Sequence, residues 1–379
     1  MIYFDSAATS LLKPLSVGEA VLSAMQSFGG PGRGSHPASL DASRCVYQAR
    51  KAVADLFGCV PERTVFTSNG TESLNIAING VLSHEDHVIT TVIEHNSVLR
   101  PLYRLRDKGM GLSAVEMTTD GSLNYDSFKD CLRKNTKAVV CTHASNLTGY
   151  VTDIDFISDF CKKNGLLLIV DASQTAGLLP INLEQMGIDI LCFTGHKGLY
   201  GPQGTGGLCI GEDVDISPLK VGGSGIFSYS EKHPDKLPES LEAGTLNAHG
   251  IAGLLAGVKY ISGTGQESIR KKGLELAGQF IDGISKIPEV RIYRRETDEY
   301  VPIVLINIGS APSGEVGDRL AYDYDICVRT GAHCAPLAHI SLGTREQGAI
   351  RFSFSSFNTS EEIKEGIKAV SEIAADYRR

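Results

Sequence analysis

The chain has 379 residues, 42% of them hydrophobic and 21% charged, which is typical of a folded soluble protein with two or three domains. Its formal net charge of −8 and the lack of a basic run argue against direct binding of nucleic acid. Nine cysteines form no CxxC pair, so we expect neither a disulfide framework nor a metal site. No signal peptide or membrane span is recognisable, and we expect a cytoplasmic protein that does not act at a membrane.

The first half of the chain alternates short apolar runs with amphipathic stretches. Helical periodicity is typical of residues 71–82 and 153–164. Strand-like runs occur at 63–67, 87–92, 137–142, 166–170 and 188–193. This alternation predicts βαβ units and an α/β fold, with helices on both faces of a mainly parallel sheet.

The second half of the chain has a different pattern. Residues 211–250 are rich in glycine, serine, proline and charge, which predicts a long irregular connection of the kind that is often functional. A helical region follows over 251–287, and strand-like runs follow at 301–308, 326–329 and 349–354. The last helix is predicted by a capping box at Thr359 and Glu362 and by an apolar face after it. The C-terminal third is therefore expected to form an α+β domain.

One lysine stands out because it follows a strand-like run and lies among glycines, in Phe193-Thr-Gly-His-Lys-Gly-Leu-Tyr-Gly-Pro-Gln-Gly204. Enclosed there, Lys197 would have a lowered pKa and could act as a Schiff-base nucleophile, although an arbitrary loop lysine is usually solvated. Asp171 ends an earlier strand, at the edge where open α/β sheets bind ligands. An aspartate there is usually a cap, but with Lys197 it suits the partner of a pyridinium nitrogen. The turn at 67–75 offers helix N-terminal amides to a phosphate, a weak signal alone.

Three motifs then occur in order: Phe4-Asp-Ser-Ala-Ala-Thr9, Asp171-Ala-Ser-Gln174 and Thr194-Gly-His-Lys197. Together they resemble the class V group of fold-type I enzymes that depend on pyridoxal 5'-phosphate (PLP). More narrowly, the sequence is similar to cysteine desulfurases and selenocysteine lyases, and the resemblance covers residues 5–358. It implies that the cofactor is PLP.

The resemblance also implies the architecture of a fold-type I PLP-dependent transferase. We expect a large PLP-binding α/β domain over residues 15–250, built on a mainly parallel sheet of the seven-stranded type. A smaller α+β domain would combine residues 1–14 with 251–379. The same resemblance implies that the protein is a homodimer.

Cofactor-binding roles are carried over from the family residue by residue. Lys197 would form the Schiff base, Asp171 would pair with the pyridine nitrogen, and Gln174 would bind the phenolic oxygen. His95 would stack on the ring and help to move protons. The remaining cofactor contacts would come from Gly70, Thr71, Thr194 and His196 at the phosphate, Asn146 near the cofactor oxygen and the substrate, and Thr245 at the phosphate of the neighbouring subunit. For His95 and His196, a core or capping histidine is the open alternative.

The segment Val328-Arg-Thr-Gly-Ala-His-Cys-Ala-Pro336 resembles the active-site cysteine loop of the desulfurases. A turn with nearby arginine and histidine would expose the Cys334 thiol and favour its thiolate, whereas most other cysteines should be buried hydrophobes. Arg351 matches the arginine that grips the α-carboxylate of the substrate, a task for which a guanidinium is suited. Substrate contacts are also expected from Asn146, Arg329 and His36.

Two features of the sequence indicate to which group of this family the chain is most similar. Only seventeen positions separate Cys334 from Arg351, so the cysteine loop is short, and the connection from Gly222 to Gly244 is long. Both features resemble the group II desulfurases, in which a short ordered loop limits movement of the cysteine. The segment around Arg33 and His36, expected near the entrance, resembles a less characterised subgroup.

The resemblance implies a cysteine desulfurase that converts L-cysteine to L-alanine, leaves a persulfide on Cys334 and passes the sulfur to an acceptor protein. Catalysis would rest on Lys197, His95 and Cys334. A selenocysteine lyase would use the same residues, and an aminotransferase or β-elimination lyase would leave Cys334 incidental. A non-catalytic sulfur-transfer scaffold is disfavoured by the intact set of site residues. A nicotinamide site at 201–207 is disfavoured because these glycines precede a strand-like run.

Overall fold

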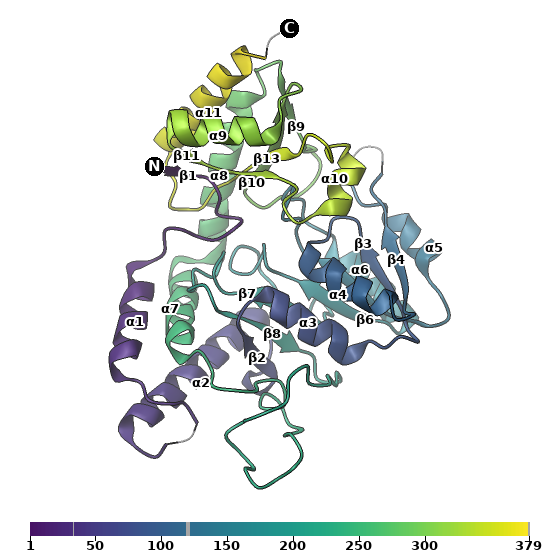
Figure 1. Ribbon diagram of the computed structural model, residues 1–379, viewed down its shortest axis with the longest axis vertical. Coiled ribbons are helices and arrows are strands. Elements are labelled where there is room, and N and C mark those ends of the chain that lie inside the picture. The colour runs from purple at the N-terminus through teal and green to yellow at the C-terminus, as the bar shows by residue number, and fades with distance from the viewer. Residues whose placement is uncertain (33, 119–121, 378–379) are drawn as a thin grey trace.

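The computed structural model describes residues 1–32, 34–118 and 122–377, and a seven-stranded sheet lies at its centre (Figure 1). The strand order is β2-β8-β7-β6-β5-β3-β4; β8 is antiparallel to both neighbours and the other adjacent pairs are parallel. The strands are β2 (Thr64–Thr67), β3 (His87–Thr91), β4 (Gly111–Val115), β5 (Thr136–Thr142), β6 (Leu167–Asp171), β7 (Ile190–Thr194) and β8 (Gly206–Ile210). The predicted α/β fold with a mainly parallel seven-stranded sheet is confirmed.

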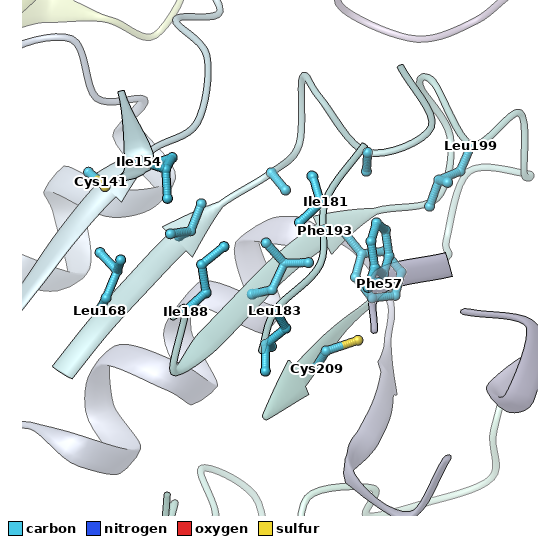
Figure 2. Packing of buried hydrophobic residues seen from close by; sticks show 14 of the residues in the cluster. Phe57, Cys141, Ile154, Leu168, Ile181, Leu183, Ile188, Phe193, Leu199 and Cys209 are labelled. Atoms are coloured by element: carbon cyan, nitrogen blue, oxygen red, sulfur yellow. The ribbon is translucent and has the colours of Figure 1, made fainter. Parts of the chain in front are cut away.

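Both faces of this sheet are covered, and alternate side chains of a strand enter different cores. Leu168 and Val170 of β6 belong to the cluster seen in part in Figure 2, whereas Ile169 belongs to the cluster on the other face. The accompanying helices are α1 (Leu15–Ser27), α2 (Pro37–Phe57), α3 (Gly70–Val81), α4 (Asn96–Arg106), α5 (Phe128–Cys131), α6 (Ile154–Asn164) and α7 (Ala248–Thr264), with 3-10 turns at Pro61–Arg63 and Tyr125–Ser127.

Residues 290–353 contribute a four-stranded antiparallel sheet of order β12-β13-β10-β9. Its strands are β9 (Val290–Ile292), β10 (Ile303–Ile308), β12 (Arg329–Gly331) and β13 (Ala349–Ser353), while β1 (Ile2–Tyr3) pairs in parallel with β11 (Ile326–Cys327). The helices here are α8 (Gln266–Ile284), α9 (Ser313–Tyr324), α10 (Pro336–Leu342) and α11 (Ser360–Ala375). These strands and helices share a second hydrophobic core, which contains Phe4, Phe280 and Phe352.

Most predicted elements are found within a few residues of their expected positions. The helical region at 251–287 is two helices, because Gly265, at φ +88°, ends α7. The strand-like run at 326–329 is also two strands, which belong to different sheets. The capping box of Thr359 and Glu362 at the start of α11 is confirmed.

The connection from 211 to 247 contains no helix or strand, as predicted, and every residue in it is described. The helix that follows it, α7, packs against α1 and α2, and its buried residues join the cluster of Figure 2. The predicted division at residue 250 stays a prediction. Over the described ranges, no helix has both the length and the apolar character that crossing a membrane requires.

Candidate active site

A pocket of about 190 Å³ lies where the carboxyl ends of β5, β6 and β7 meet the N-termini of α3 and α4. Ligands of open α/β sheets bind at this edge. Eleven residues predicted from the sequence line the pocket: Gly70, Thr71, His95, Asn146, Asp171, Gln174, Thr194, His196, Lys197, Arg329 and Arg351. The last two come from the four-stranded sheet, so both parts of the chain build the site.

One end of the pocket has the donors that a phosphate group requires. Asn69 caps α3 by accepting a bond from the Glu72 amide at 2.9 Å, and Gly70 is the first residue of the helix. A Cβ at Gly70 would lie 2.8 Å from Ser173 Oγ, so only glycine leaves this approach open. The buried Thr194 Oγ1 has no hydrogen-bond partner among the described residues. Helix amides with an unpartnered hydroxyl suit an anion.

The groups that would face a pyridine ring lie next to the end of the pocket that would bind phosphate. Asp171 is buried at the end of β6 and accepts a bond from the Ser173 amide at 2.9 Å. His95 is the N-cap of α4; its Nδ1 accepts from the Ser97 amide at 3.0 Å, which leaves the ring proton on Nε2 in the neutral form. The predicted carboxylate, imidazole and lysine therefore share one pocket, and they fit PLP.

Burial and charge set the protonation of the two bases. Burial, with the nearby positive charges of Arg351 and Arg329, lowers the pKa of Lys197 to about 8, although Asp171 opposes this shift. Burial lowers the pKa of His95 to about 4. Near neutral pH, His95 is therefore an uncharged base, and a usable fraction of Lys197 is a free amine.

Glu94, next to His95 in sequence, is a fully buried acid behind the pocket. Its Oε1 accepts bonds from Thr91 Oγ1 at 2.6 Å and the Thr142 amide at 3.0 Å, and Oε2 has no partner among the described residues. Burial raises the pKa of this carboxyl to about 8. Glu94 is therefore largely uncharged at neutral pH and adds little negative charge to the site.

Arg351 is 1% exposed and reaches the pocket from β13. Its Nη1 donates to the Asn146 carbonyl at 2.8 Å and its Nη2 to Asp5 Oδ1 at 2.7 Å, while Nε has no partner among the described residues. The guanidinium is held from two sides and retains an unused donor, as a carboxylate-binding arginine requires. Burial lowers its pKa, and Asp5 opposes this shift.

The cysteine loop, residues 331–335, connects β12 to α10. His333 and Cys334 both have positive φ, at +50° and +56°, which strains residues that carry a side chain. Asn146 Nδ2 donates to the His333 carbonyl at 2.7 Å, and the Asn96 amide donates to the Cys334 carbonyl at 2.8 Å. Cys334 is half-buried, and Arg329 Nη2 donates to its Sγ at 3.7 Å. Cys334 does not line the pocket itself, but Arg329 does.

Two buried histidines support the loop through a directed chain of hydrogen bonds. His333 Nε2 lies 3.0 Å from the Arg329 carbonyl, which can only accept, so Nε2 carries the proton. Nδ1 of His333 then accepts from His339 Nε2 at 3.4 Å. His339 Nδ1 in turn accepts from Thr344 Oγ1 at 2.7 Å. Burial lowers the pKa of both histidines, so the chain is built from neutral rings.

Two predicted site residues lie elsewhere in the single chain. Thr245 is exposed and lines a different cavity together with Arg50 and Glu242. His36 is the exposed N-cap of α2 and does not line the pocket, so its substrate role stays a prediction. Arg33 lies outside the described residues.

Three residues that contact the pocket residues were not predicted from the sequence to have a role in the site. Asp5 holds Arg351, Ser97 hydrogen-bonds both His95 and Thr71, and Ser173 lies beside Gly70. Asp5 and Ser173 lie inside the quoted motifs, and Ser97 lies two residues after His95. Their position next to stronger signals is the only sequence cue that could have found them.

Known proteins with similar sequences and structures cover nearly the whole chain. A probable cysteine desulfurase of Methanothermobacter thermautotrophicus is 33% identical over 98% of this chain and 94% of its own. The apo cysteine desulfurase of Thermococcus onnurineus superimposes with a TM-score of 0.92 at 33% identity, covering 99% of this chain and 95% of that one.

A second solved structure, the Escherichia coli cysteine desulfurase CsdA, gives a TM-score of 0.89 at 26% identity over 100% of this chain and 95% of that one. The aminotransferase class-V family matches residues 2–365. The chain therefore belongs to the aminotransferase class-V family.

Proposed function

We propose that the protein is a PLP-dependent cysteine desulfurase that converts L-cysteine to L-alanine and keeps the sulfur as a persulfide on Cys334. One observation carries this proposal: Arg329 lines the pocket of Lys197 and also donates to Cys334 Sγ at 3.7 Å. A soft nucleophile thus lies next to a site with the donor set of a PLP pocket. The similar proteins named cysteine desulfurases support the same assignment.

Each part of the cofactor has a residue to hold it. Gly70, Thr71, Thr194 and His196 would bind the phosphate, and Lys197 would be the covalent attachment. Gln174 and Asn146 would contact the phenolic oxygen, and Asp171 would pair with the ring nitrogen beneath His95. Bound PLP supplies an electron sink for the bonds at Cα of an amino acid.

Substrate recognition would rest on Arg351. Its carbonyl and carboxylate partners fix the plane of the guanidinium, and the free Nε is available to the α-carboxylate of L-cysteine. Lys197 and His95, with pKa values lowered to about 8 and about 4, would take the Cα proton and return protons to the product. Arg351, Asp5 and the cysteine loop would exclude water from the substrate sulfur.

Sulfur transfer would then be a displacement at sulfur. The Cys334 thiolate forms an S–S bond with the substrate sulfur while the Cβ–S bond breaks. The electron pair of the broken bond remains with the carbon, and Cβ takes up a proton to become the methyl group of alanine. Arg329 Nη2 donates to Sγ at 3.7 Å, and this contact would orient the sulfur of Cys334 toward the pocket that Arg329 lines.

The proposal includes a homodimer in which Thr245 reaches the phosphate of the neighbouring subunit. Two observations support an interface here: Thr245 is exposed, and the same connection exposes Val221, Phe227 and Tyr229. Large apolar side chains of this kind mark contact surfaces. Sedimentation of the wild type and of the double variant Phe227→Ser/Tyr229→Ser tests the proposed dimer interface. A wild type that sediments as a monomer would contradict the homodimer.

A protein acceptor for the persulfide sulfur is part of the proposal. The hydrogen bonds from Asn146 and Asn96 hold the short cysteine loop in place, which supports delivery to an acceptor that approaches the loop. The acceptor is expected to present a thiol, because a persulfide passes its outer sulfur to a thiolate.

Product analysis with L-cysteine and a reductant separates this function from its alternatives. The proposal predicts alanine and sulfide in equal amounts, whereas pyruvate and ammonia would indicate β-elimination. A selenocysteine lyase would show a much higher kcat/KM for selenocysteine than for cysteine and would retain it in Cys334→Ala. If addition of PLP to the purified protein produces no absorbance band, the result would indicate a non-catalytic sulfur-transfer scaffold.

A further inference from the structure

A second cavity, of about 440 Å³, lies where the end of β4 approaches β9 and the end of α10. It shares no residue with the Lys197 pocket. Its lining includes the arginines Arg291, Arg294 and Arg295 and the tyrosines Tyr150, Tyr293 and Tyr300. A cavity of this volume accommodates a small organic molecule.

Arg294 is a half-buried arginine of this cavity. Its Nη1 is buried and has no hydrogen-bond partner among the described residues. Its guanidinium carbon lies 4.1 Å from the centre of the Tyr300 ring, which fixes the side chain by a cation–π contact. A buried donor atom without an acceptor is costly unless a ligand supplies one.

Among the described residues, few carboxylates lie close to these arginines. Arg291 packs over Tyr293 at 4.7 Å and has no ion pair with any described residue. Arg295 lies 3.5 Å from Asp298, so this third arginine has a carboxylate neighbour. Glu116 is the one acidic side chain among the described lining residues, and it is exposed. The described lining of the cavity is therefore positive, in a chain whose net charge is −8.

The wall behind the arginines is rigid. Tyr150 and Tyr300 are buried, and their backbones form an antiparallel bridge. The Tyr150 hydroxyl bonds the Tyr125 hydroxyl at 2.9 Å, and the Tyr300 hydroxyl accepts from the Arg295 amide at 2.9 Å. Both hydroxyls therefore have partners in the protein, whereas the buried Arg294 Nη1 has none among the described residues.

From this arrangement we propose that the cavity is a binding site for a small anion that carries phosphate or carboxylate groups. Arg294 is the principal ligand and Arg291 the second. Guanidinium forks bind both kinds of group in a bidentate manner. The binding site is independent of the function proposed above.

The site is connected by packing to the cysteine loop. Tyr293 and Leu342 line the cavity and also pack against the hydrophobic cluster that contains Ala335 and Ala338. Ala335 directly follows Cys334, and Leu342 is the last residue of α10.

Calorimetric titration of the PLP-loaded protein with pyrophosphate and with citrate tests the binding site. Loaded protein is used because bound PLP occupies the phosphate donors at Gly70. We expect saturable binding of at least one anion, weakened about tenfold or more by Arg294→Met. Arg294→Lys should bind with intermediate affinity, because it keeps the charge but loses the fork. The two probes show which anionic group is preferred.

Arg106→Gln is the matched control, because Arg106 is an exposed arginine that stacks on Tyr103 at 4.6 Å outside the cavity. It should bind the anions like the wild type. Equal loss of affinity in Arg106→Gln and Arg294→Met would overturn the proposal, and so would the absence of saturable binding by both probes. If Arg294→Met impairs only sulfur delivery to a protein acceptor, the surface serves a protein, and the small-anion proposal is wrong.

Discussion

Lys197 shows how neighbouring residues prepare a single side chain for its chemistry. Burial lowers its pKa to about 8, the positive charges of Arg351 and Arg329 act in the same direction, and Asp171 opposes them. The same Arg351 that would bind the substrate therefore also keeps part of Lys197 in the free-amine form. A change at one residue should consequently be measurable at the other.

We expect Arg351→Gln to raise the pKa of Lys197, because it removes a nearby positive charge. The rate at which the apoprotein takes up PLP, followed by absorbance, should rise with pH. Its midpoint should lie near pH 8 in the wild type and higher in the variant. Arg319→Gln is the control: this half-buried arginine of α9 forms ion pairs with Asp323 and Asp376 and does not line the pocket, so its loss should leave the midpoint unchanged. An unchanged midpoint in Arg351→Gln would contradict the assigned electrostatics.

Glu94 gives a prediction about stability. Its folded pKa of about 8 lies above the ordinary carboxyl value, so the folded state holds a proton that the unfolded state releases. The free energy of unfolding therefore falls as pH rises from about 4.5 to about 8. Glu94→Gln removes this dependence and should be stabilised relative to the wild type by on the order of 1–3 kcal/mol at pH 9, but not at pH 5. Thermal unfolding of both proteins at both pH values measures this difference in stability. If the difference between Glu94→Gln and the wild type is the same at pH 5 and pH 9, Glu94 is not a buried neutral acid.

At the scale of elements, the proposed binding of phosphate at the N-terminus of α3 requires that Gly70 leave the helix amides accessible. Gly70→Ala places a methyl group 2.8 Å from Ser173 Oγ, in the space next to the unpartnered Thr194 hydroxyl. We expect PLP affinity to fall by about tenfold or more, since a preformed anion site is obstructed. Equilibrium dialysis measures the affinity.

Gly314→Ala is the matched control for this change. Gly314 lies in α9, where an added Cβ has nothing within 4 Å. The control should keep wild-type PLP affinity and lose no stability, because alanine favours the helix. Equal PLP affinity in Gly70→Ala and Gly314→Ala would argue against a phosphate cradle at α3.

The cysteine loop is the second element whose conformation matters. His333 and Cys334 stay at positive φ because hydrogen bonds from both sides hold them, and the His333–His339–Thr344 chain is one of these supports. Thr344→Val deletes the hydroxyl at nearly constant volume and should slow persulfide formation about tenfold in a single turnover. PLP absorbance and the apparent affinity for L-cysteine should not change.

Thr344→Ser is the control, since it restores the hydroxyl that His339 needs. It should recover most of the rate of persulfide formation. If Thr344→Val and Thr344→Ser behave alike, the chain of buried histidines does not position Cys334, and the loop is held by the two asparagines alone.

In the whole molecule, the site exists because two sheets meet. The seven-stranded sheet supplies Asp171, and the loop after its strand β7 supplies Lys197. The four-stranded sheet supplies Arg329 and Arg351, and Asp5 of the N-terminal segment holds Arg351. Figure 1 shows the two sheets. Neither part of the chain alone presents both the lysine and the arginine that the proposed function requires.

Much of the large sheet could be predicted because its strands are continuous apolar runs. β5 and β7, buried over nearly their whole length, are examples. β4 could not be found, because it is an edge strand whose residues are only partly buried and include Gly111 and Ser113. In β8, Gly207 is required by packing, since a Cβ would lie 2.5 Å from the Val65 carbonyl. Local patterning does not reveal such a contact.

The pocket residues could be predicted from motifs, but their supports could not. Asp5 lies 346 positions from the arginine that it holds, and nothing local to either residue indicates the pair. The Asn146 bond to the cysteine loop likewise spans 187 positions. Such contacts come from tertiary packing, whereas a motif shows only which residues occur together in sequence.

Mass analysis of the intact protein and of its proteolytic peptides, after a single turnover with L-cysteine, tests the central claim most directly. The account predicts that the wild type gains the mass of one sulfur atom on the peptide that contains Cys334 and releases one equivalent of alanine. Cys334→Ser should bind PLP and L-cysteine normally but gain no sulfur. If Cys334→Ser releases alanine at the wild-type rate, or if the sulfur of the wild type is found on another residue, the account is wrong.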